Sequence, residues 1–270
     1  MTQGATTLGE QSGGEPATVL AERVSMVYES PDQGGLKALD EVSLDLPPGT
    51  FCSLVGPSGC GKSTFLMLVA GLFSPTTGRL AIDGNDVEEP WDGLGGVFQR
   101  DALLEWRTVL DNVLLPIEVK RLSKKTYRQR ASELLDLVGL TGFERYYPEK
   151  LSGGMRQRVA ICRSLIHDPR LLLMDEPFAS VDALTRERLN FDLLRLTGGA
   201  STTVVFVTHS IEEAVLLSDR VLVMGPRPGR IVHSVADDLP QPRTLETKSS
   251  ARFHELVDDI RSDFHSMGLV

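Results

Sequence analysis

Three groups of polar residues in this chain have the types and spacing that phosphate chemistry requires. The first is the stretch 56–64, which reads GPSGCGKST and matches the pattern G-x-x-x-x-G-K-[ST] of a phosphate-binding loop. The apolar run 51–55 before it is typical of a short strand, and the run 65–70 after it of a buried helix. We therefore expect a nucleotide to bind between this strand and this helix.

The residue types of this loop fit that role. Glycines permit the dihedral angles and the close approach with which backbone N–H groups surround phosphates, and the helix that follows directs its positive end at them. Lys62 is expected to reach the β- and γ-phosphate oxygens, and the Ser63 hydroxyl to bind Mg²⁺. The expected nucleotide-binding residues here are Gly56, Pro57, Ser58, Gly59, Cys60, Gly61, Lys62, Ser63 and Thr64.

The second and third groups follow two further apolar runs. Asp175 and Glu176 come directly after the run 171–174, which is unbroken as a central parallel strand should be. His209 ends the run 202–208 in the same way. Ligands of α/β sheets bind at the carboxyl ends of the strands, so Asp175 suits Mg²⁺ coordination, Glu176 suits activation of the attacking water, and His209 suits contact with the γ-phosphate.

Three weaker signals are open to structural readings. Tyr28 ends a strand-like segment, 19–28, and could stack on a nucleotide base or simply pack in the core. Ser152 precedes Gly153 and Gly154 at the start of a helical segment and could cap that helix, which leaves N–H groups able to meet a second anion. Cys60 could be an oxidation-sensitive switch, although a tolerated small residue is the simpler reading.

Composition narrows the classes of protein. The chain has 270 residues, an apolar content of 41% and no apolar run of about 18 residues, which predicts a large core and no membrane-spanning helix. Three cysteines in core-like segments indicate a reducing cytosol rather than a disulfide framework. A formal net charge of −9 argues against nucleic acid as the main partner, because phosphate neutralisation needs clustered Lys and Arg.

The chain also divides by pattern. Residues 1–18 are polar and glycine-rich and read as a disordered leader. From about residue 100 to 165 helical spacing replaces strand patterns, which predicts a helical subdomain inserted in an α/β core that spans 19–235. In the C-terminal extension 236–270, Phe253, Leu256, Ile260 and Phe264 fit one helical face, and we expect this amphipathic helix to dock on the body.

The order of these motifs resembles the nucleotide-binding subunit of an ABC transporter. The phosphate loop is followed by Gln99, then LSGGMRQR at 151–158, LLLMDEP at 171–177, SVD at 180–182 and His209, so that the resemblance covers roughly residues 19–235. It implies a P-loop NTPase fold of the α/β class with a mixed sheet, in which a RecA-like parallel core carries an antiparallel β subdomain and the inserted α-helical subdomain.

The resemblance also implies roles for matching residues. Tyr28 corresponds to the aromatic residue that stacks on adenine, and Gln99 to the glutamine that contacts Mg²⁺ and the attacking water. Glu176, His209 and Gln99 are then the expected catalytic residues, and Ser63, Gln99 and Asp175 the Mg²⁺ ligands. Ser152, Gly153, Gly154 and Gln157 form a signature that binds the γ-phosphate held by a second protomer, and Asp182 lies at the dimer interface.

Such a subunit is expected to hydrolyse ATP with Mg²⁺ as a head-to-tail homodimer. It would lie peripherally at the cytoplasmic face of the membrane, bind permease subunits and serve a periplasmic or lipid-anchored solute-binding protein indirectly. The segments 97–113 and 226–231 resemble importers of nitrate, sulfonates, taurine and related compounds, although such proteins commonly carry proline where Glu105 stands and leucine where Val181 stands.

Two other classes of function were weighed against this one. An ABC ATPase of DNA repair or of ribosomes usually carries long coiled-coil insertions or two fused cassettes, whereas this chain has one cassette and a short insertion. A regulatory module that holds nucleotide without turnover would be expected to lack Glu176 and His209. Because this kind of subunit does not touch the solute, the choice among nitrate, a sulfonate, taurine and a pyrimidine precursor stays open.

Overall fold

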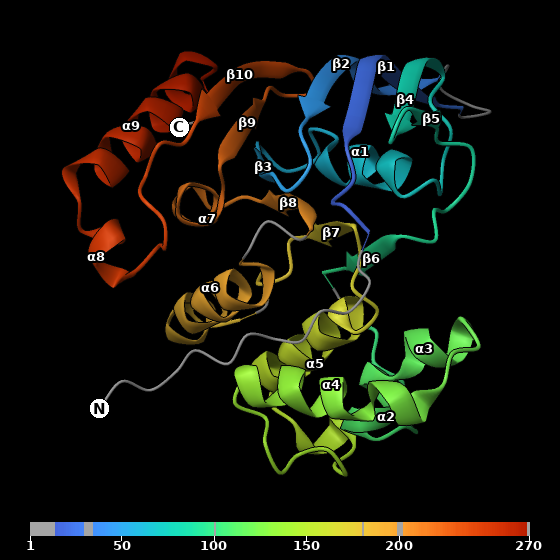
Figure 1. Ribbon diagram of the computed structural model, residues 1–270. Coiled ribbons are helices and arrows are strands. Elements are labelled where there is room, and N and C mark those ends of the chain that lie inside the picture. The colour runs from blue at the N-terminus through green and yellow to red at the C-terminus, as the bar shows by residue number, and fades with distance from the viewer. Residues whose placement is uncertain (1–13, 30–34, 100, 180, 199–201, 269–270) are drawn as a thin grey trace.

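The computed structural model describes residues 14–29, 35–99, 101–179, 181–198 and 202–268, and the fold is given for these (Figure 1). Two β-sheets lie at one end of the molecule, and a group of helices lies at the other. The predicted disordered leader falls mostly on residues 1–13, outside the described residues. Just before the first strand, the Ala17 N–H donates to the Arg170 carbonyl at 3.0 Å, and the Thr18 N–H donates to Asp83 Oδ1 at 2.9 Å.

The larger sheet carries the phosphate loop and the acidic pair. Its strand order is β10-β9-β3-β8-β7-β6, and all neighbours are parallel except β10 and β9. Its strands are β3 (Phe51–Val55), β6 (Leu94–Val97), β7 (Leu171–Asp175), β8 (Thr203–Thr208), β9 (Arg220–Met224) and β10 (Ile231–Ala236). β3 and β8 are buried along their whole length, as strands covered on both faces must be.

The parallel order decides where the polar residues lie. β8 is paired with β3 on one side and with β7 on the other, so the carboxyl ends of the three strands meet at one edge of the sheet. The phosphate loop follows β3, Glu176 follows β7, and His209 follows β8. The expected convergence of the three groups of polar residues at one sheet edge is therefore present.

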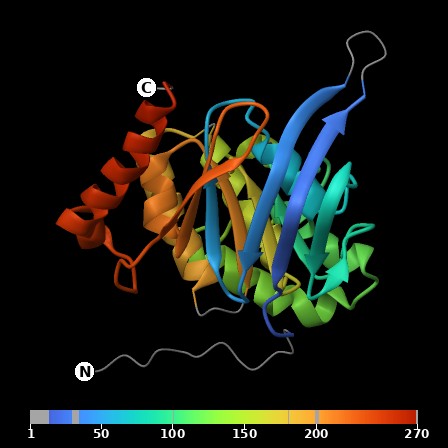
Figure 2. The same ribbon diagram turned by 90° about the horizontal axis from the view of Figure 1, so that it is seen from above.

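The smaller sheet is antiparallel and has the order β2-β1-β4-β5. Its strands are β1 (Val19–Tyr28), β2 (Leu36–Leu46), β4 (Thr77–Ile82) and β5 (Asn85–Asp86). Helix α1 (Lys62–Val69) begins within the phosphate-loop stretch 56–64 and packs beside this sheet, which is drawn in blue to cyan in Figure 2. Phe65 and Leu68 of α1 share one buried apolar cluster with residues of β1, β2 and β3.

The helical subdomain lies between β6 and β7 in the sequence and stands apart from the sheets in Figure 1. It consists of α2 (Val109–Val113), α3 (Leu115–Val119), α4 (Lys124–Leu137), the 3₁₀ turn η1 (Pro148–Lys150) and α5 (Gly153–Leu165). The helical spacing in this segment was that of its apolar residues, and these are all buried in one cluster. They are Val109, Val113, Leu114, Ile117, Leu134, Leu135 and Val138. The same cluster continues onto α6 (Ala183–Thr197) through Leu189 and Leu193.

The C-terminal extension docks as its apolar pattern predicts. Helix α9 (Ala251–Ser266) follows the short α8 (Leu245–Lys248) and packs against α7 (Ile211–Leu217) and β10. The four apolar residues predicted to form its docking face, Phe253, Leu256, Ile260 and Phe264, are all buried in the cluster around α7.

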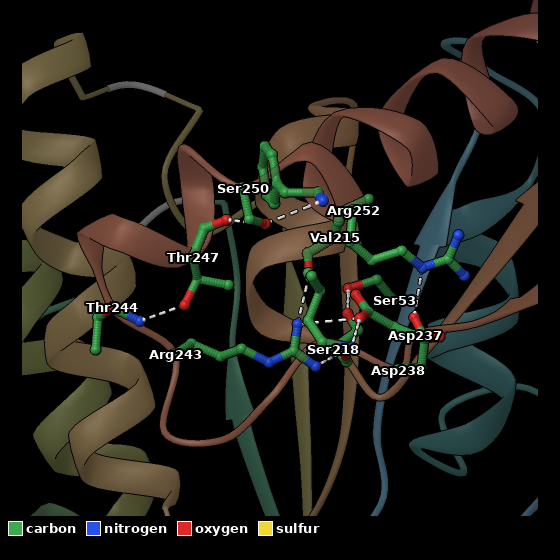
Figure 3. A network of polar contacts seen from close by, with 12 residues as sticks. Ser53, Val215, Ser218, Asp237, Asp238, Arg243, Thr244, Thr247, Ser250 and Arg252 are labelled. Atoms are coloured by element: carbon green, nitrogen blue, oxygen red, sulfur yellow. Dashed lines mark hydrogen bonds and ion pairs between the residues drawn. The ribbon is translucent and has the colours of Figure 1, made fainter.

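A buried arginine fixes the segment that leads to these helices (Figure 3). Arg243 Nη1 donates to Asp237 Oδ1 at 3.1 Å and to the Val215 carbonyl at 3.2 Å, and Nη2 donates to the Ser218 carbonyl at 3.1 Å. Both side chains of the Arg243–Asp237 pair are only 1% exposed. Arg243 thereby caps the last carbonyl groups of α7, which completes hydrogen bonds that a helix end leaves open.

Candidate active site

The phosphate loop is shaped by backbone conformations that suit glycine. Gly59 and Gly61 have φ angles of +75° and +109°, in the left-handed region that other residues adopt at a cost. Gly61 is the N-cap residue of α1 and supplies no side-chain cap, so the first N–H groups of the helix are not closed off by a side chain. This arrangement offers backbone donors and a positive helix end to an anion.

Lys62 lies folded over the loop that it is expected to serve. Its ammonium Nζ donates to the carbonyl of Gly56 at 2.7 Å and to that of Pro57 at 3.1 Å, and the residue is 5% exposed. A buried ammonium group with these two partners stands where a phosphate oxygen would compete for it. The contact supports the predicted role of Lys62 as the cation of the phosphate site.

Ser63 and Asp175 meet although 112 residues separate them. Ser63 Oγ donates to Asp175 Oδ1 at 3.0 Å, which brings together two of the predicted Mg²⁺ ligands. Burial raises the pKa of the Asp175 carboxyl, and the hydrogen bond from Ser63 offsets this only in part. Hydroxyl and carboxylate oxygens are the donors that Mg²⁺ prefers, and among the described residues no cluster of three or more His, Cys, Asp or Glu could hold a metal by itself. The pair therefore fits a magnesium ion that also binds nucleotide phosphates.

Glu176 and His209 form a second contact at the same edge. His209 Nδ1 lies 3.4 Å from Glu176 Oε2, and the two side chains are 52% and 25% exposed. Glu176 has a φ of +45°, a strained backbone conformation for a residue with a side chain, and its N–H donates to the Val207 carbonyl of β8 at 2.9 Å. The backbone of Glu176 is thus anchored to β8, and its side chain lies next to His209.

Tyr28 lies beside the phosphate loop rather than in the centre of the core. Its hydroxyl is 3.2 Å from Thr64 Oγ1, and its ring meets the ring of Phe73 edge-on with 6.0 Å between the centroids. Tyr28 is half-buried. This placement is compatible both with stacking of the ring on a nucleotide base and with packing of the ring in the protein. It also brings the ring close to the expected nucleotide.

Gln99 lies at the entrance to the helical subdomain. It follows β6, which is the edge strand next to β7, and its side chain is exposed. Arg100, the next residue, lies outside the described residues. Gln99 is therefore placed at the sheet edge of the site, with a side chain that is accessible to a ligand.

The predicted signature begins a helix, as its sequence indicates. Ser152 Oγ accepts from the Met155 N–H at 3.3 Å and so caps α5, while Ser152 and Gly153 are exposed. Gln157 differs from its neighbours, because it is 3% exposed and its Nε2 lacks a hydrogen-bond partner in the described structure.

Asp182 is the N-cap residue of α6, as Ser152 is of α5. Its Oδ1 accepts from the Thr185 N–H at 3.1 Å and caps the helix, and hydrogen bonds from Thr185 lower the pKa of its carboxyl. Asp182 is exposed, whereas Ser180, the first residue of the SVD motif, lies outside the described residues. The helix cap accounts for an aspartate at this position. The exposed part of its side chain remains available to an interface.

The position of Cys60 helps to decide whether it is an oxidation-sensitive switch or a tolerated small residue. The side chain is 1% exposed, and burial raises the pKa of the thiol despite the nearby ammonium group of Lys62. A protonated, buried thiol reacts slowly with oxidants. The structure therefore favours the reading of Cys60 as a small residue tolerated in the loop.

Sequence reasoning missed three residues that support this edge. Phe73 braces the Tyr28 ring, and Glu213 accepts a hydrogen bond from Thr208 Oγ1 at 2.6 Å, just before His209. Arg186 of α6 lies 3.6 Å from the same Glu213 carboxylate. Burial raises the pKa of Glu213. Glu213 stands three residues after Ser210, the N-cap of α7, and that spacing was the available signal.

A phosphate loop between a central strand and a helix, with an acidic pair ending a nearby strand, defines this chain as a P-loop nucleoside triphosphatase. The model of the family described as "ABC transporter" matches residues 39–179. The chain belongs to the ABC transporter family, as an ATP-binding ATPase domain.

Similar proteins extend the match to most of the chain. An uncharacterized ABC transporter ATP-binding protein of Methanocaldococcus jannaschii, MJ0412, is 46% identical over 90% of this chain and 90% of its own length. The taurine import ATP-binding protein TauB of Rhizobium johnstonii is 46% identical over 85% of this chain and 89% of its own. The aliphatic sulfonates import ATP-binding protein SsuB of Bacillus cereus is 40% identical over 94% and 98%.

A solved structure agrees in fold. The dimeric post-hydrolysis state of the ATP-binding cassette MJ0796 with ADP and Pi is similar with a TM-score of 0.71 and 33% identity. It covers 81% of this chain and 98% of its own. The predicted fold, a P-loop core with a parallel sheet, an antiparallel sheet and inserted helices, is confirmed. Within the part of the chain that the structure describes, no helix combines the length and apolar character needed to span a membrane.

Proposed function

We propose that this chain is the ATP-hydrolysing subunit of an importer for a small organic anion or zwitterion, with an alkyl sulfonate or taurine as the favoured solute. The observation that carries this proposal is the similarity to import proteins over nearly the whole chain, since TauB and SsuB relatives align with 85% and 94% of it. The ABC ATPases of DNA repair and of ribosomes are disfavoured by the same relatives.

The proposed roles of the residues follow from the geometry of the sheet edge. The phosphate loop and Lys62 bind the β- and γ-phosphates, and Tyr28 offers its ring to the adenine. Ser63, Asp175 and Gln99 would hold Mg²⁺, which supplies positive charge that neutralises the phosphates during transfer. Glu176 accepts the proton of the attacking water, and His209, 3.4 Å away, orients that carboxylate and faces the γ-phosphate.

A second protomer completes the proposed site. The N-terminus of α5 begins at the exposed Ser152 and Gly153, and the first backbone N–H groups of a helix can donate to an anion. In a head-to-tail homodimer it would contact the γ-phosphate bound by the partner, next to Asp182 at the interface. Closing the dimer excludes water and aligns the reactants, and loss of the bridging phosphate lets the two halves part. Because its side chain is buried, Gln157 would contribute to this contact only through the backbone of its helix.

The proposed partners follow from the same assignment. Permease subunits would supply the membrane passage, and a periplasmic or lipid-anchored solute-binding protein would select the solute without touching this chain. The ATPase would then lie peripherally on the cytoplasmic side of the membrane. The proposed division of the chain is a leader before β1, the ATPase domain 19–235 with its helical subdomain at about 100–165, and the docked C-terminal extension.

A pull-down from detergent-solubilised membranes of the source organism tests this proposal. The bait is the Glu176→Gln form with ATP, which should keep the closed dimer, and the control is the Lys62→Ala form, which should not close. Recovery of a protein with several membrane-spanning helices, with the first bait only, supports the importer. A co-purified binding protein is then screened with taurine, alkyl sulfonates and nitrate by thermal shift. Recovery of only soluble or nucleic-acid-bound partners overturns the transport function and leaves the ATPase chemistry standing.

A further inference from the structure

The loop between β9 and β10, residues 225–230, carries the sequence GPRPGR, for which the chemistry above has no role. We call it the bracing loop. β9 is the parallel neighbour of β3, so the bracing loop and the phosphate loop leave the sheet at the same edge. The Gly225 N–H donates to the Arg230 carbonyl at 2.9 Å, which closes the bracing loop at its base. The two loops thus follow neighbouring parallel strands, β3 and β9, at the same edge of the sheet.

Arg227 of the bracing loop contacts the outer side of the phosphate loop. Its Nε donates to the Gly59 carbonyl at 3.1 Å, across 168 residues of sequence. Among the described residues this is the one hydrogen bond that Arg227 makes, and no carboxylate pairs with it. The guanidinium group is exposed and lies against a loop whose function is to surround negative charge.

The peptide unit that Arg227 contacts matters for phosphate binding. The Gly59 carbonyl belongs to the same peptide group as the Cys60 N–H, one of the backbone donors of the loop. That N–H donates at 3.3 Å to the Pro57 carbonyl, a long hydrogen bond that a phosphate oxygen could replace. A charged donor at the carbonyl end polarises the peptide group and strengthens its N–H as a donor. Arg227 therefore both orients this peptide group and favours an anion at its other end.

Gly229 fixes the next peptide group by direct contact. A Cβ atom at Gly229 would lie 2.0 Å from the Cys60 carbonyl oxygen, so only glycine fits at this distance. Gly229 cannot easily withdraw, because its N–H donates to the Ala38 carbonyl and its carbonyl accepts from the Asp40 N–H, each at 2.9 Å. The bracing loop thus contacts two successive carbonyl groups of the phosphate loop and is itself tied to β2.

We propose that Arg227 is a positioning residue for the phosphate loop, supported by Gly229. It acts through the Gly59–Cys60 peptide group and so through the β-phosphate cradle, without contacting the reacting atoms. This inference rests on the proposed binding of ATP by the phosphate loop. It predicts a loss of affinity that ATP and ADP share, because both carry the phosphates that the cradle surrounds, and a rate of hydrolysis at saturating ATP that changes little.

The test compares Arg227→Ala, Arg227→Lys and the matched control Arg230→Ala. Arg230 is an exposed guanidinium of the same loop that pairs with Asp40 instead of the phosphate loop. Dissociation constants for ATP and ADP are measured by calorimetry in the Glu176→Gln background, and KM and kcat in the otherwise native protein. Thermal unfolding shows whether each variant stays folded. Arg227→Ala should raise both dissociation constants and KM by roughly three- to tenfold, the size of one net hydrogen bond.

The expected pattern has three parts. Arg227→Lys should recover part of the loss because it keeps a charged donor, Arg230→Ala should bind as the parent does, and kcat of Arg227→Ala should stay within about twofold of the parent. Parent-like affinity of Arg227→Ala for both nucleotides overturns the inference. So does a loss for ATP alone, which would indicate direct contact with the γ-phosphate, and so does an equal loss in Arg230→Ala. If the parent protein itself fails to bind ATP, the proposed function falls rather than the role of Arg227.

Discussion

His209 Nδ1 lies 3.4 Å from Glu176 Oε2, and the two residues follow the parallel neighbours β8 and β7. Neither side chain is deeply buried, since they are 52% and 25% exposed. The contact joins the proposed base to the histidine that is proposed to face the γ-phosphate. Glu176 also has a left-handed backbone conformation, which is strained for a residue with a side chain.

Glu176→Gln should abolish steady-state hydrolysis and leave ATP binding intact. The amide keeps the shape of the side chain and its contact with His209 but cannot accept the proton of the attacking water. We expect kcat to fall roughly a hundredfold or more, the usual share of a general base. Phosphate release measures the rate, and gel filtration with ATP shows whether the dimer stays closed. Normal steady-state turnover in this variant would remove Glu176 from the mechanism.

Asp175 should make the metal-free protein less stable as pH rises. Burial raises the pKa of its carboxyl in the folded state, so the folded protein binds this proton more tightly than the unfolded chain does. The destabilisation is absent at acid pH, where Asp175 is protonated in both states, develops as pH rises from the ordinary carboxyl pKa of the unfolded chain towards the raised folded pKa, and is complete above that pKa. Asp175→Asn, which can still accept from Ser63 Oγ, should therefore be the more stable form at neutral pH, and this advantage should vanish toward acid pH.

Binding of Mg²⁺ and ATP should reverse the order of stability of the native protein and Asp175→Asn. A bound cation favours the carboxylate, so Mg²⁺ with ATP should stabilise the native protein more than Asp175→Asn at neutral pH. Chemical denaturation across the pH range, with and without Mg²⁺ and ATP, measures both effects. Equal stability of the two metal-free forms at every pH would refute the raised pKa of Asp175, and an equal gain from Mg²⁺ with ATP in both forms would refute the placement of the metal at Asp175.

Tyr28 should contribute to ATP affinity through its ring and not through its hydroxyl. Tyr28→Ala removes the aromatic surface beside the phosphate loop and should weaken ATP binding by roughly two- to tenfold, as aromatic contacts usually do. Tyr28→Phe loses only the half-buried 3.2 Å contact with Thr64 Oγ1 and should bind nearly as the parent. Calorimetry with ATP separates the two variants. Unchanged affinity in Tyr28→Ala would leave the ring with a packing role against Phe73.

The sequence predicted the elements that follow local rules. Three apolar runs predicted strands: one before the phosphate loop, one leading to Asp175 and one leading to His209. In a parallel sheet the carboxyl ends of such strands lie at one edge, so their convergence could be predicted from the sequence alone. The face of α9 could be predicted for the same reason, because helical periodicity alone selects Phe253, Leu256, Ile260 and Phe264.

The sequence could not predict contacts between segments whose approach depends on the finished fold. Arg227 reaches Gly59 across 168 residues, and only the pairing of β9 with β3 makes this contact possible. Gln157 reads as a polar surface residue of a signature, yet it is buried in the structure, with an exposed fraction of 3%. The sequence gives no sign that Arg243 is buried, because a single arginine in a polar linker is usually exposed.

Arg243 should hold the C-terminal extension on the body. Replacing it by Met would leave Asp237 buried without its partner and expose no new charge, and breaking a buried ion pair costs about 3–5 kcal/mol of stability. The carbonyl groups of Val215 and Ser218 at the end of α7 would also lose their donor. We therefore expect Arg243→Met to lower the free energy of unfolding by about that amount, with the first loss of hydrogen-exchange protection in α9.

Arg252→Met is the matched control, since Arg252 pairs with Asp238 in the same extension but both side chains are exposed, at 48% and 66%. It should leave the free energy of unfolding nearly unchanged, because exposed ion pairs are weakened by solvent. Adding Asp237→Asn to Arg243→Met should restore part of the loss by removing the stranded charge. Equal effects of Arg243→Met and Arg252→Met would show that the buried pair does not fasten the extension. Because α7 begins just after His209, such a detachment would also reach the sheet edge at which ATP is hydrolysed.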